Sequence, residues 1–299
     1  MANSGEKPFV RLSASTLLGA YGLKPKKSLG QNFLASPATG EMLADRMEIT
    51  GEDTVLEIGA GLGALTFPMA SRAKFVHAVE TDGRLCPILQ EQAAALGLSN
   101  VAVVCKDILS TRLSDFSEGE PLVVAGNLPY HISSPVLAWL VAQRSLVKRA
   151  YLMFQKELAR RILAKPGGKD YSRISVLAAY ASTVTPLADL DAERFYPRPK
   201  VKSRALAFDF DKPGFADPEA EQRFFKTVEA AFSTRRKALR NALAHGGAAA
   251  DPKQAEAALK AAGIDPSRRA ETLDIDEFMR LSTHVGRVSG RVKPNPNYS

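Results

Sequence analysis

TVLEIGAGLGALT, at residues 54–66, is the stretch that decides the fold. The apolar run TVLEI (54–58) has the length and β-branched composition of a buried strand, and it leads directly into Gly59, Gly61 and Gly63. Glycines allow the backbone to turn sharply and to approach a ligand at the carboxyl edge of a sheet, where α/β folds bind nucleosides. A helix is predicted to start inside this glycine loop. The spacing also fits the dinucleotide pattern G-x-G-x-x-G/A, so the loop alone leaves NAD and an adenosyl ligand as alternatives.

Four more short apolar runs follow, with helical patterns between them. Two helix starts carry an N-cap serine followed by proline at the first helical position, at Ser36-Pro37 and Ser134-Pro135. This alternation predicts an α/β fold with a mostly parallel, doubly wound sheet. The further predicted strands are KFVHAVE (74–80), NVAVVC (100–105), PLVVAG (121–126) and RAYLMF (149–154).

The composition changes after the sheet segments. FDFDKPGFADPEAE (208–221) is rich in proline, aspartate and glycine, and alanine-rich helical patterns follow it. We predict a linker there and a small all-helical domain beyond it. The predicted helices span 221–232, 235–244 and 251–263. The predicted division is a mobile tail at 1–14, an α/β domain at 15–210, a helical domain at 211–285 and a mobile tail at 286–299.

Composition excludes several classes of protein. The chain has 299 residues, enough for about two domains, and 45% of them are hydrophobic, enough for a sizeable core. Its two cysteines, Cys86 and Cys105, are too few for a disulfide scaffold, and its four histidines have no metal-ligand spacing. No apolar run of about 18 residues and no export leader is present. We therefore expect a monomer in a reducing cytosol, with no metal and no membrane contact.

Positive charge is concentrated in the second half of the chain. Residues 1–140 hold 11 basic and 14 acidic residues, whereas residues 141–299 hold 29 basic and 18 acidic residues. Three basic clusters, at 144–173, 194–204 and 235–240, favour a surface that binds nucleic-acid phosphates over ordinary solvated helix faces. The candidate RNA-binding residues are Arg160, Arg161, Arg198, Lys200, Arg235, Arg236 and Lys237.

Two carboxylates follow predicted strands next to the glycine loop. Glu80 ends the second strand, where a carboxylate is placed to accept hydrogen bonds from two ribose hydroxyls. Asp107 follows the third strand, where it is placed to accept from an exocyclic adenine amine, although an aspartate there is also typical of a turn or helix cap. Both positions favour a bound nucleoside.

The tetrapeptide Asn127-Leu128-Pro129-Tyr130 follows the fourth strand and indicates the chemistry. The Asn127 side-chain oxygen and a main-chain carbonyl at Leu128 or Pro129 are suited to accept from one planar NH2 group, with Tyr130 stacked on its ring. Paired acceptors favour a pyramidal nitrogen whose lone pair points outward. Methyl transfer from a sulfonium then needs mainly alignment, and no strong base.

These residues resemble those of the ribosomal RNA adenine N6-dimethyltransferases, most closely the bacterial small-subunit enzymes. The resemblance covers residues 16–283 and implies a Rossmann-like S-adenosylmethionine-dependent methyltransferase sheet with a small helical C-terminal domain. Its motifs are KKSLGQNFL (26–34), VLEIGAGLGALT (55–66), VETD (79–82), KDIL (106–109), GNLPYHISSPV (126–136), MFQKELARRI (153–162), FYPRPKVKS (195–203), FSTRRKALRNAL (232–243) and RAETLDIDEFMRL (269–281).

The resemblance also implies roles for individual residues. The target adenine is implied to lie at Asn127, Leu128, Pro129 and Tyr130, with Phe195 as a second stacking wall. The implied S-adenosylmethionine contacts are Asn32, Leu34, Gly59, Glu80, Asp107 and Asn127, to which we add Gly61 of the same loop. The chain departs from the family pattern at Lys202, where an acidic residue is usual, and at Ser172, where glycine is usual. We expect Lys202 to add to the basic surface.

The implied reaction is the transfer of four methyl groups to two adjacent adenosines near the 3′ end of small-subunit rRNA, in the immature 30S subunit. The large-subunit enzyme of macrolide resistance shares the cofactor motifs, but the C-terminal motifs favour the small-subunit enzyme. A DNA adenine methyltransferase more often has proline in place of Leu128, and an NAD-dependent oxidoreductase leaves the tetrapeptide unexplained. An rRNA-binding assembly factor with secondary methylation is a further alternative.

Overall fold

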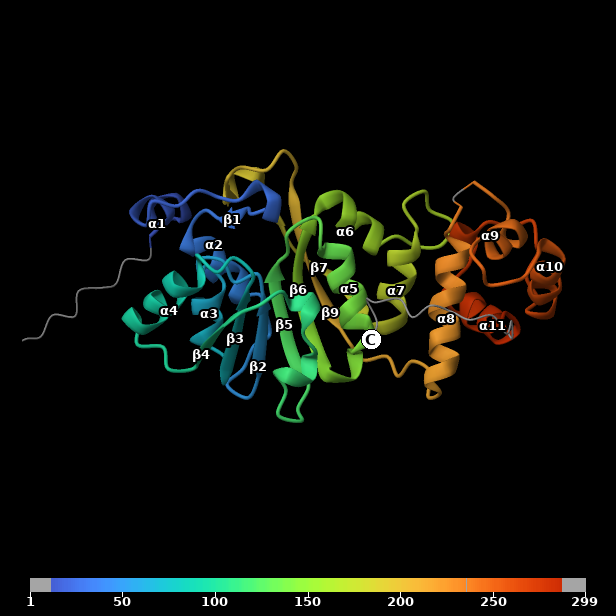
Figure 1. Ribbon diagram of the computed structural model, residues 1–299, viewed down its shortest axis with the longest axis horizontal. Coiled ribbons are helices and arrows are strands. Elements are labelled where there is room, and N and C mark those ends of the chain that lie inside the picture. Colours follow the sequence, from blue (N-terminus) through green and yellow to red (C-terminus); the bar gives the residue numbers. More distant parts are fainter. Residues whose placement is uncertain (1–11, 235, 287–299) are drawn as a thin grey trace, which may run out of the picture. The chain divides into compact units, whose positions relative to one another are not determined.

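The computed structural model describes residues 12–234 and 236–286, and these residues form two compact units (Figure 1). The first unit comprises residues up to 136 together with 143–156 and 185–208; the second comprises 137–142, 157–184 and the residues from 209 onward. Contacts thus group 137–142 and 157–184 with the second unit, whereas the predicted division at 210 keeps them in the first domain; that division stays a prediction. Most of the predicted tails, and Arg235, lie outside the described residues.

A seven-stranded sheet in the order β4-β3-β2-β5-β6-β9-β7 confirms the α/β prediction. The pairs β2–β3, β3–β4, β2–β5 and β5–β6 are parallel, and each predicted strand coincides with one of these five. Strands β7 and β9 were not predicted from the sequence. The strands are β2 (Thr54–Ile58), β3 (Phe75–Glu80), β4 (Val101–Cys105), β5 (Leu122–Asn127), β6 (Val147–Gln155), β7 (Thr183–Leu190) and β9 (Ser203–Asp209).

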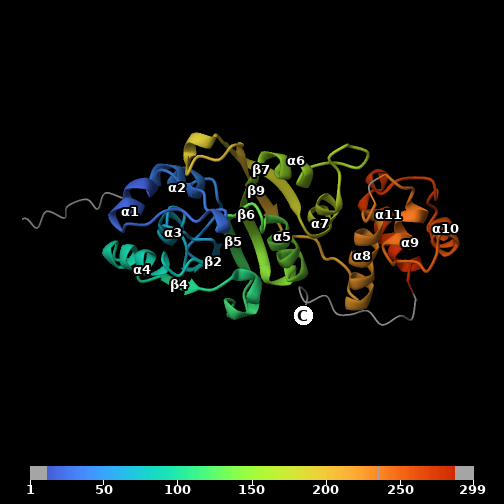
Figure 2. The ribbon, with the colours of Figure 1, turned by 45° about the horizontal axis from the view of Figure 1, so that its top comes forward.

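Helices α1 to α4 lie beside strands β2 to β4 (Figure 2). Ser36 is the predicted N-cap, since its side chain accepts from the Ala38 amide at 3.3 Å. The predicted cap at Ser134 is wrong, because α5 already includes Ser133. The four helices are α1 (Ala14–Ala20), α2 (Pro37–Ala44), α3 (Thr66–Ala70) and α4 (Cys86–Ala95), and α5 (Ser133–Ala142) follows β5.

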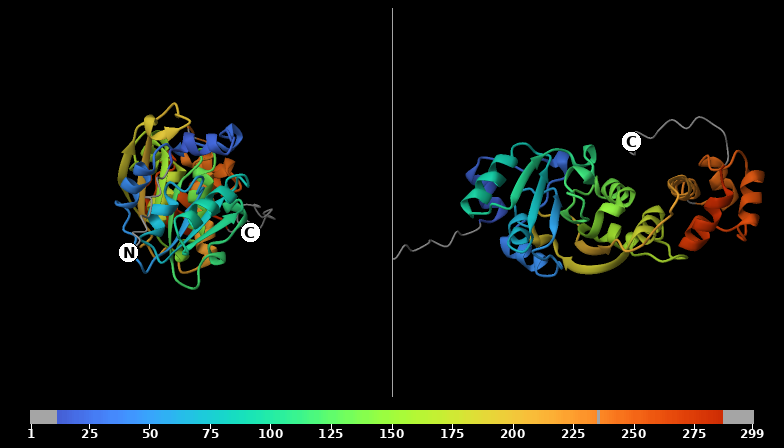
Figure 3. Two further views of the ribbon diagram at one scale, coloured as in Figure 1. Left: turned by 90° about the vertical axis from the view of Figure 1, so that its left-hand side faces the viewer. Right: turned by 90° about the horizontal axis from the view of Figure 1, so that it is seen from below.

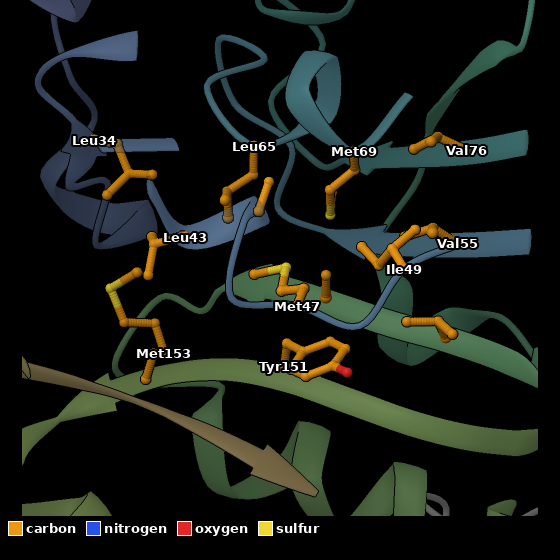
Figure 4. Packing of buried hydrophobic residues seen from close by; sticks show 14 of the residues in the cluster. Leu34, Leu43, Met47, Ile49, Val55, Leu65, Met69, Val76, Tyr151 and Met153 are labelled. Carbon is orange, nitrogen blue, oxygen red and sulfur yellow. The ribbon is translucent and has the colours of Figure 1, made fainter. Parts of the chain in front are cut away.

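A two-stranded antiparallel sheet, β1 (Phe33–Leu34) with β8 (Phe195–Tyr196), joins distant parts of the first unit. Leu34 of β1 packs into a buried cluster with Met47, Val55 and Tyr151 (Figure 4). This cluster ties the segment before α2 to the strands. Short 3-10 helices lie at Lys27–Leu29, Ile108–Ser110, Leu113–Asp115, Arg144–Leu146, Ala192–Arg194 and Ala270–Thr272.

The second unit is mainly helical, and its C-terminal helices lie together in orange and red in Figure 3. Helices α8, α9 and α10 confirm the three helices predicted beyond the linker. Aromatic rings form part of its core, with Phe232 contacting both Tyr171 and Phe278. The helices are α6 (Lys156–Ile162), α7 (Arg173–Ala181), α8 (Pro218–Ala231), α9 (Leu239–His245), α10 (Pro252–Ala261) and α11 (Ile275–His284).

Cys86, at the start of α4, and Cys105, at the end of β4, form a disulfide. This pair was not predicted from the sequence, because 19 positions separate the two residues and the parallel pairing of β3 with β4 brings them together. None of the described helices is long and apolar enough to cross a membrane.

Candidate active site

A cavity lies at the carboxyl edge of the parallel strands, inside the first unit. Its walls come from the segment before α2, the glycine loop after β2, and the ends of β3, β4 and β5. The structure brings together at this cavity every residue that the sequence analysis assigned to the cofactor, and the whole tetrapeptide. These residues are Asn32, Leu34, Gly59, Gly61, Glu80, Asp107, Asn127, Leu128, Pro129 and Tyr130.

The glycine loop has a backbone that only glycine adopts without strain. Gly59, Gly61 and Gly63 have φ values of 75°, 56° and 85°. The loop is held to β3, because the amides of Gly59 and Ala60 both donate to the Val79 carbonyl, at 2.9 and 3.0 Å. The expectation that a helix starts inside the loop is wrong: α3 begins at Thr66, after the last left-handed glycine.

Glu80 is buried and held from two sides. One carboxylate oxygen accepts from the Gly61 amide and the other from the Asp82 amide, both at 2.8 Å. Burial raises the pKa of Glu80, and these two hydrogen bonds act against that rise. Each oxygen has a second lone pair for another donor, so the group is ready to accept from a vicinal diol.

Asp107 both caps a helix and lines the cavity. Its side chain accepts from the Leu109 amide at 3.0 Å at the start of the 3-10 helix Ile108–Ser110. The capping role that the sequence allowed is therefore present, and a contact with a ligand remains a proposal.

The Asn127 amide has a defined orientation. Its Nδ2 donates to the Asn32 carbonyl at 2.7 Å, which leaves the side-chain oxygen as the acceptor. The two candidate carbonyls differ, because that of Pro129 already accepts from the Ile132 amide and the Ser133 hydroxyl, both at 3.1 Å. The carbonyl of Leu128 is the better second acceptor for an incoming amine. The Tyr130 hydroxyl is buried without a partner among the described residues.

Phe195 does not share this cavity. Its side chain is 4% exposed and packs in the buried cluster that contains Leu34, its partner across the β1–β8 pair. Alternation along β8 leaves Tyr196 exposed instead. The structure thus does not assemble the second stacking wall that the resemblance implied.

Glu57, in β2, lines the cavity and was not singled out from the sequence. It is buried, its Oε2 accepts from the Thr66 hydroxyl at 2.5 Å, and burial raises its pKa to about 8. The signal was a charged residue inside an otherwise apolar strand. A neutral carboxyl is the form expected here at neutral pH.

Several candidate RNA-binding side chains are paired within the chain. Arg160 contacts Asp170 at 2.8 Å, and Arg198 contacts Glu193. Lys202 pairs with Asp191 at 2.8 Å while its side chain stays 64% exposed, so its contribution to the basic surface stays a prediction. Lys200, Arg236 and Lys237 are exposed, and the Arg161 guanidinium donates to Ser172 at 3.4 Å.

Ser172 has a local explanation. It is the N-cap of α7, and its backbone amide donates to the Ser175 hydroxyl oxygen at 3.0 Å. The Ser172 hydroxyl oxygen also lies 3.4 Å from that of Ser175, a contact that a glycine cannot make. This departure from the family pattern therefore concerns the start of a helix.

Comparisons with known proteins find similarity to rRNA adenine methyltransferases. The family model described as "Ribosomal RNA adenine dimethylase" matches residues 22–285. "Ribosomal RNA small subunit methyltransferase A" of Desulforapulum autotrophicum is 47% identical over 274 residues, which cover 92% of this chain and 96% of the relative. Two solved structures are each 26% identical: a dimethyladenosine transferase from Plasmodium falciparum (TM-score 0.70, 83% of this chain, 95% of the other) and the 23S rRNA methyltransferase ErmE (TM-score 0.62, 85% and 99%).

Proposed function

The chain belongs to the ribosomal RNA adenine dimethylase family, and we propose that the cavity at the carboxyl edge of its sheet binds S-adenosylmethionine. The protein is a small-subunit rRNA adenine dimethyltransferase. The observation that carries the proposal for the cavity is that a nucleoside-type glycine loop, a doubly held Glu80 and the Asn127 acceptor all line it.

The residues present fit an adenosyl ligand. A Cβ on Gly61 would lie 3.1 Å from the Phe33 ring, so this glycine keeps the wall of the cavity open. Glu80 would accept from the ribose hydroxyls, and Asp107 from the adenine amine. Asn32, Leu34, Gly59 and Asn127 complete the proposed contacts. When bound, the donor supplies a methyl group on a sulfonium.

The tetrapeptide then activates the target amine. The Asn127 oxygen and the Leu128 carbonyl would accept the two N6 hydrogens, which directs the nitrogen lone pair away from both acceptors. Two fixed acceptors also stabilise the positive charge that develops on nitrogen as the new bond forms. The Pro129 ring and its helix-bound carbonyl hold this arrangement rigid, and Tyr130 would stack on the adenine.

The finer substrate assignment is also a proposal. We place the reaction at two adjacent adenosines in the loop of the 3′-terminal hairpin of small-subunit rRNA, each converted to N6,N6-dimethyladenosine in an immature 30S particle. A loop adenosine is already unpaired or easily flipped into a pocket. The candidates Arg160, Arg161, Arg198, Lys200 and the 235–237 cluster would contact phosphates, in a cytoplasmic monomer.

The test is methyl transfer from labelled S-adenosylmethionine to under-methylated small subunits, large-subunit rRNA and duplex DNA in parallel, with the label mapped. Dimethyladenosine in the small subunit alone is expected. Label in large-subunit rRNA would contradict the substrate assignment, and subunit binding without label would favour an assembly factor.

Asn127→Ala tests the site in the same assay. Removing one fixed acceptor is expected to lower methyl transfer by about 10²–10³-fold. Asn100→Ala is the matched control, because the Asn100 amide also donates to backbone carbonyls, those of Ala70 and Ala73, but does not line the cavity. Equal losses in the two variants would contradict the proposed role of Asn127.

A further inference from the structure

Asp82, two residues beyond Glu80, is a fully buried carboxylate with several charged and polar partners. Its side chain is 0% exposed. Lys26 Nζ donates to it at 3.0 Å and Gln31 Nε2 at 3.0 Å, while Arg84 donates through Nε at 3.0 Å and Nη2 at 2.6 Å. The Arg84 guanidinium, together with Lys26 and Gln31, holds the pKa of Asp82 well below its usual range. A buried carboxylate with so many donors stays charged, and removing its partners costs stability because it leaves a buried charge unpaired.

Two of these partners come from a distant segment, 26–32, that forms one wall of the cavity. The segment contains the 3-10 helix Lys27–Leu29 and then leads into the two-residue strand β1. A hydrogen bond within the segment holds its two ends together: the Lys26 amide donates to the Gln31 side-chain oxygen at 2.7 Å. Gln31 and Asn32 both line the cavity. Asp82 thus anchors this wall from the opposite side.

Asp82 is connected to both Glu80 and Asn127, the residues proposed to hold the methyl donor and the target amine. The Asp82 amide donates to Glu80, the proposed ribose acceptor, at 2.8 Å. On the other side, Gln31 adjoins Asn32, whose carbonyl accepts from Asn127 Nδ2 at 2.7 Å and so sets which way the Asn127 oxygen faces. One contiguous network therefore joins the donor-binding carboxylate to the acceptor that holds the target amine.

We infer that Asp82 is a positioning residue for the methyl donor: through Lys26 and Gln31 it holds the segment 26–32 against the cavity and thereby sets the affinity for S-adenosylmethionine. The inference rests on the proposed function of the cavity. It assigns no contact between Asp82 and substrate, and its effect passes through Glu80 and the segment 26–32.

Asp53 provides a matched control in the same unit. It too is a buried aspartate, accepting from Lys148 Nζ at 2.7 Å and from the Thr50 amide at 2.8 Å. It precedes β2, whereas Asp82 follows β3, so the two lie at opposite edges of the parallel strands. Asn at either position keeps the shape and removes the charge.

The experiment measures the dissociation constant of S-adenosylmethionine by calorimetry, the KM and kcat of methyl transfer, and the thermal midpoint for wild type, Asp82→Asn and Asp53→Asn. Both variants are expected to lower the midpoint. Only Asp82→Asn is expected to raise the dissociation constant and KM, by about tenfold, with a smaller change in kcat. An unchanged dissociation constant in Asp82→Asn, or an equal rise in Asp53→Asn, would overturn the inference.

Lys26→Met covers the case in which Asp82→Asn fails to fold. The Lys26 side chain is 42% exposed, so its loss leaves the core packing in place. It is expected to weaken donor binding, and the double variant Lys26→Met/Asp82→Asn should bind no more weakly than the weaker single variant, because both break one network. Additive effects would contradict a shared role. A wild type that neither binds the donor nor methylates small subunits would instead overturn the proposed function.

Discussion

At the amino end of β2, Asp53 is surrounded by donors, with the Thr50 amide and hydroxyl and the Lys148 ammonium all on its carboxylate. Near the carboxyl end of the same strand, Glu57 is buried with the Thr66 hydroxyl as its donor and the negative Glu80 nearby. The pKa shifts differ in sign. Burial alone would raise the pKa of Asp53, but Lys148 and Thr50 hold it below its usual value, whereas burial raises that of Glu57 to about 8.

The two ends of the strands differ in what their buried polar side chains do. At the amino end, a charge pair completes the hydrogen bonding of the carboxylate and contributes to stability. At the carboxyl end, the glycine loop adopts left-handed conformations without strain, and the buried Glu57 carboxyl, whose pKa burial raises, lines the cavity at a cost to stability. Under the proposed function, the amino edge of the sheet contributes stability and the carboxyl edge binds the ligand.

The largest expected effect is on the free energy of unfolding, compared for one glycine substitution at each edge of the sheet. A Cβ on Gly63 would lie 2.3 Å from the buried Phe67 ring and 2.9 Å from Leu89, at a φ of 85°. Gly63→Ala is expected to lower the free energy of unfolding by about 3 kcal/mol. Gly51, before β2, has open space around its Cβ position, so Gly51→Ala should change that energy by less than about 0.5 kcal/mol.

Chemical denaturation of both variants checks this prediction. A Gly63→Ala protein as stable as Gly51→Ala would mean that the glycine loop relaxes freely, and the contrast between the edges would then lose its steric basis.

Sequence patterns predicted the parallel strands because each has a continuous apolar run, as β5 shows with five buried positions in LVVAGN. They missed β7, whose polar residues and Pro186 suit only the edge of a sheet, which is the place that it takes. An edge strand such as β7 is only partly buried, so its sequence lacks the continuous apolar run by which the other strands were recognised.

The site was predictable to the extent that its residues follow strand ends. Glu80, Asp107 and Asn127 converge because parallel strands bring their carboxyl ends to one edge. The partners of Asp82 were not predictable, since Lys26 lies 56 positions away and no local pattern links them. The burial of Phe195 likewise depends on the β1–β8 pairing.

Glu57→Gln tests the electrostatic half of the comparison. The unfolded chain ionises this carboxyl near 4.5, whereas the folded protein does so near 8, so wild-type stability should fall as pH rises between these values. The amide cannot ionise and its oxygen still accepts from Thr66. The variant should therefore gain stability over wild type from pH 5 to pH 8, on the order of 3 kcal/mol.

Unfolding free energies at pH 5, 6.5 and 8 provide the measurement, with Glu52→Gln as a control at an exposed carboxyl next to β2. A gap between Glu57→Gln and wild type that does not change with pH would contradict the raised pKa of Glu57. A gap that Glu52→Gln reproduces would show that the effect does not come from the buried carboxyl.

The smallest expected effect belongs to the amino end, where Lys148→Met removes the ammonium and leaves Thr50 on Asp53. Because the folded-state pKa of Asp53 is depressed, the stability from this pair is present above the unfolded value near 3.8 and is lost as pH falls through the folded value. The Lys148 side chain is 48% exposed, so solvent screening limits the loss to about 1 kcal/mol at pH 7. Denaturation at pH 7, pH 4 and pH 2.5 should show a difference from wild type that is largely kept at pH 4 and shrinks at pH 2.5, below the unfolded value, with donor affinity unchanged at pH 7. A loss of donor affinity comparable to that in Lys26→Met would mean that both ends of the strands serve the cavity, and the division of labour between the two edges would then be wrong.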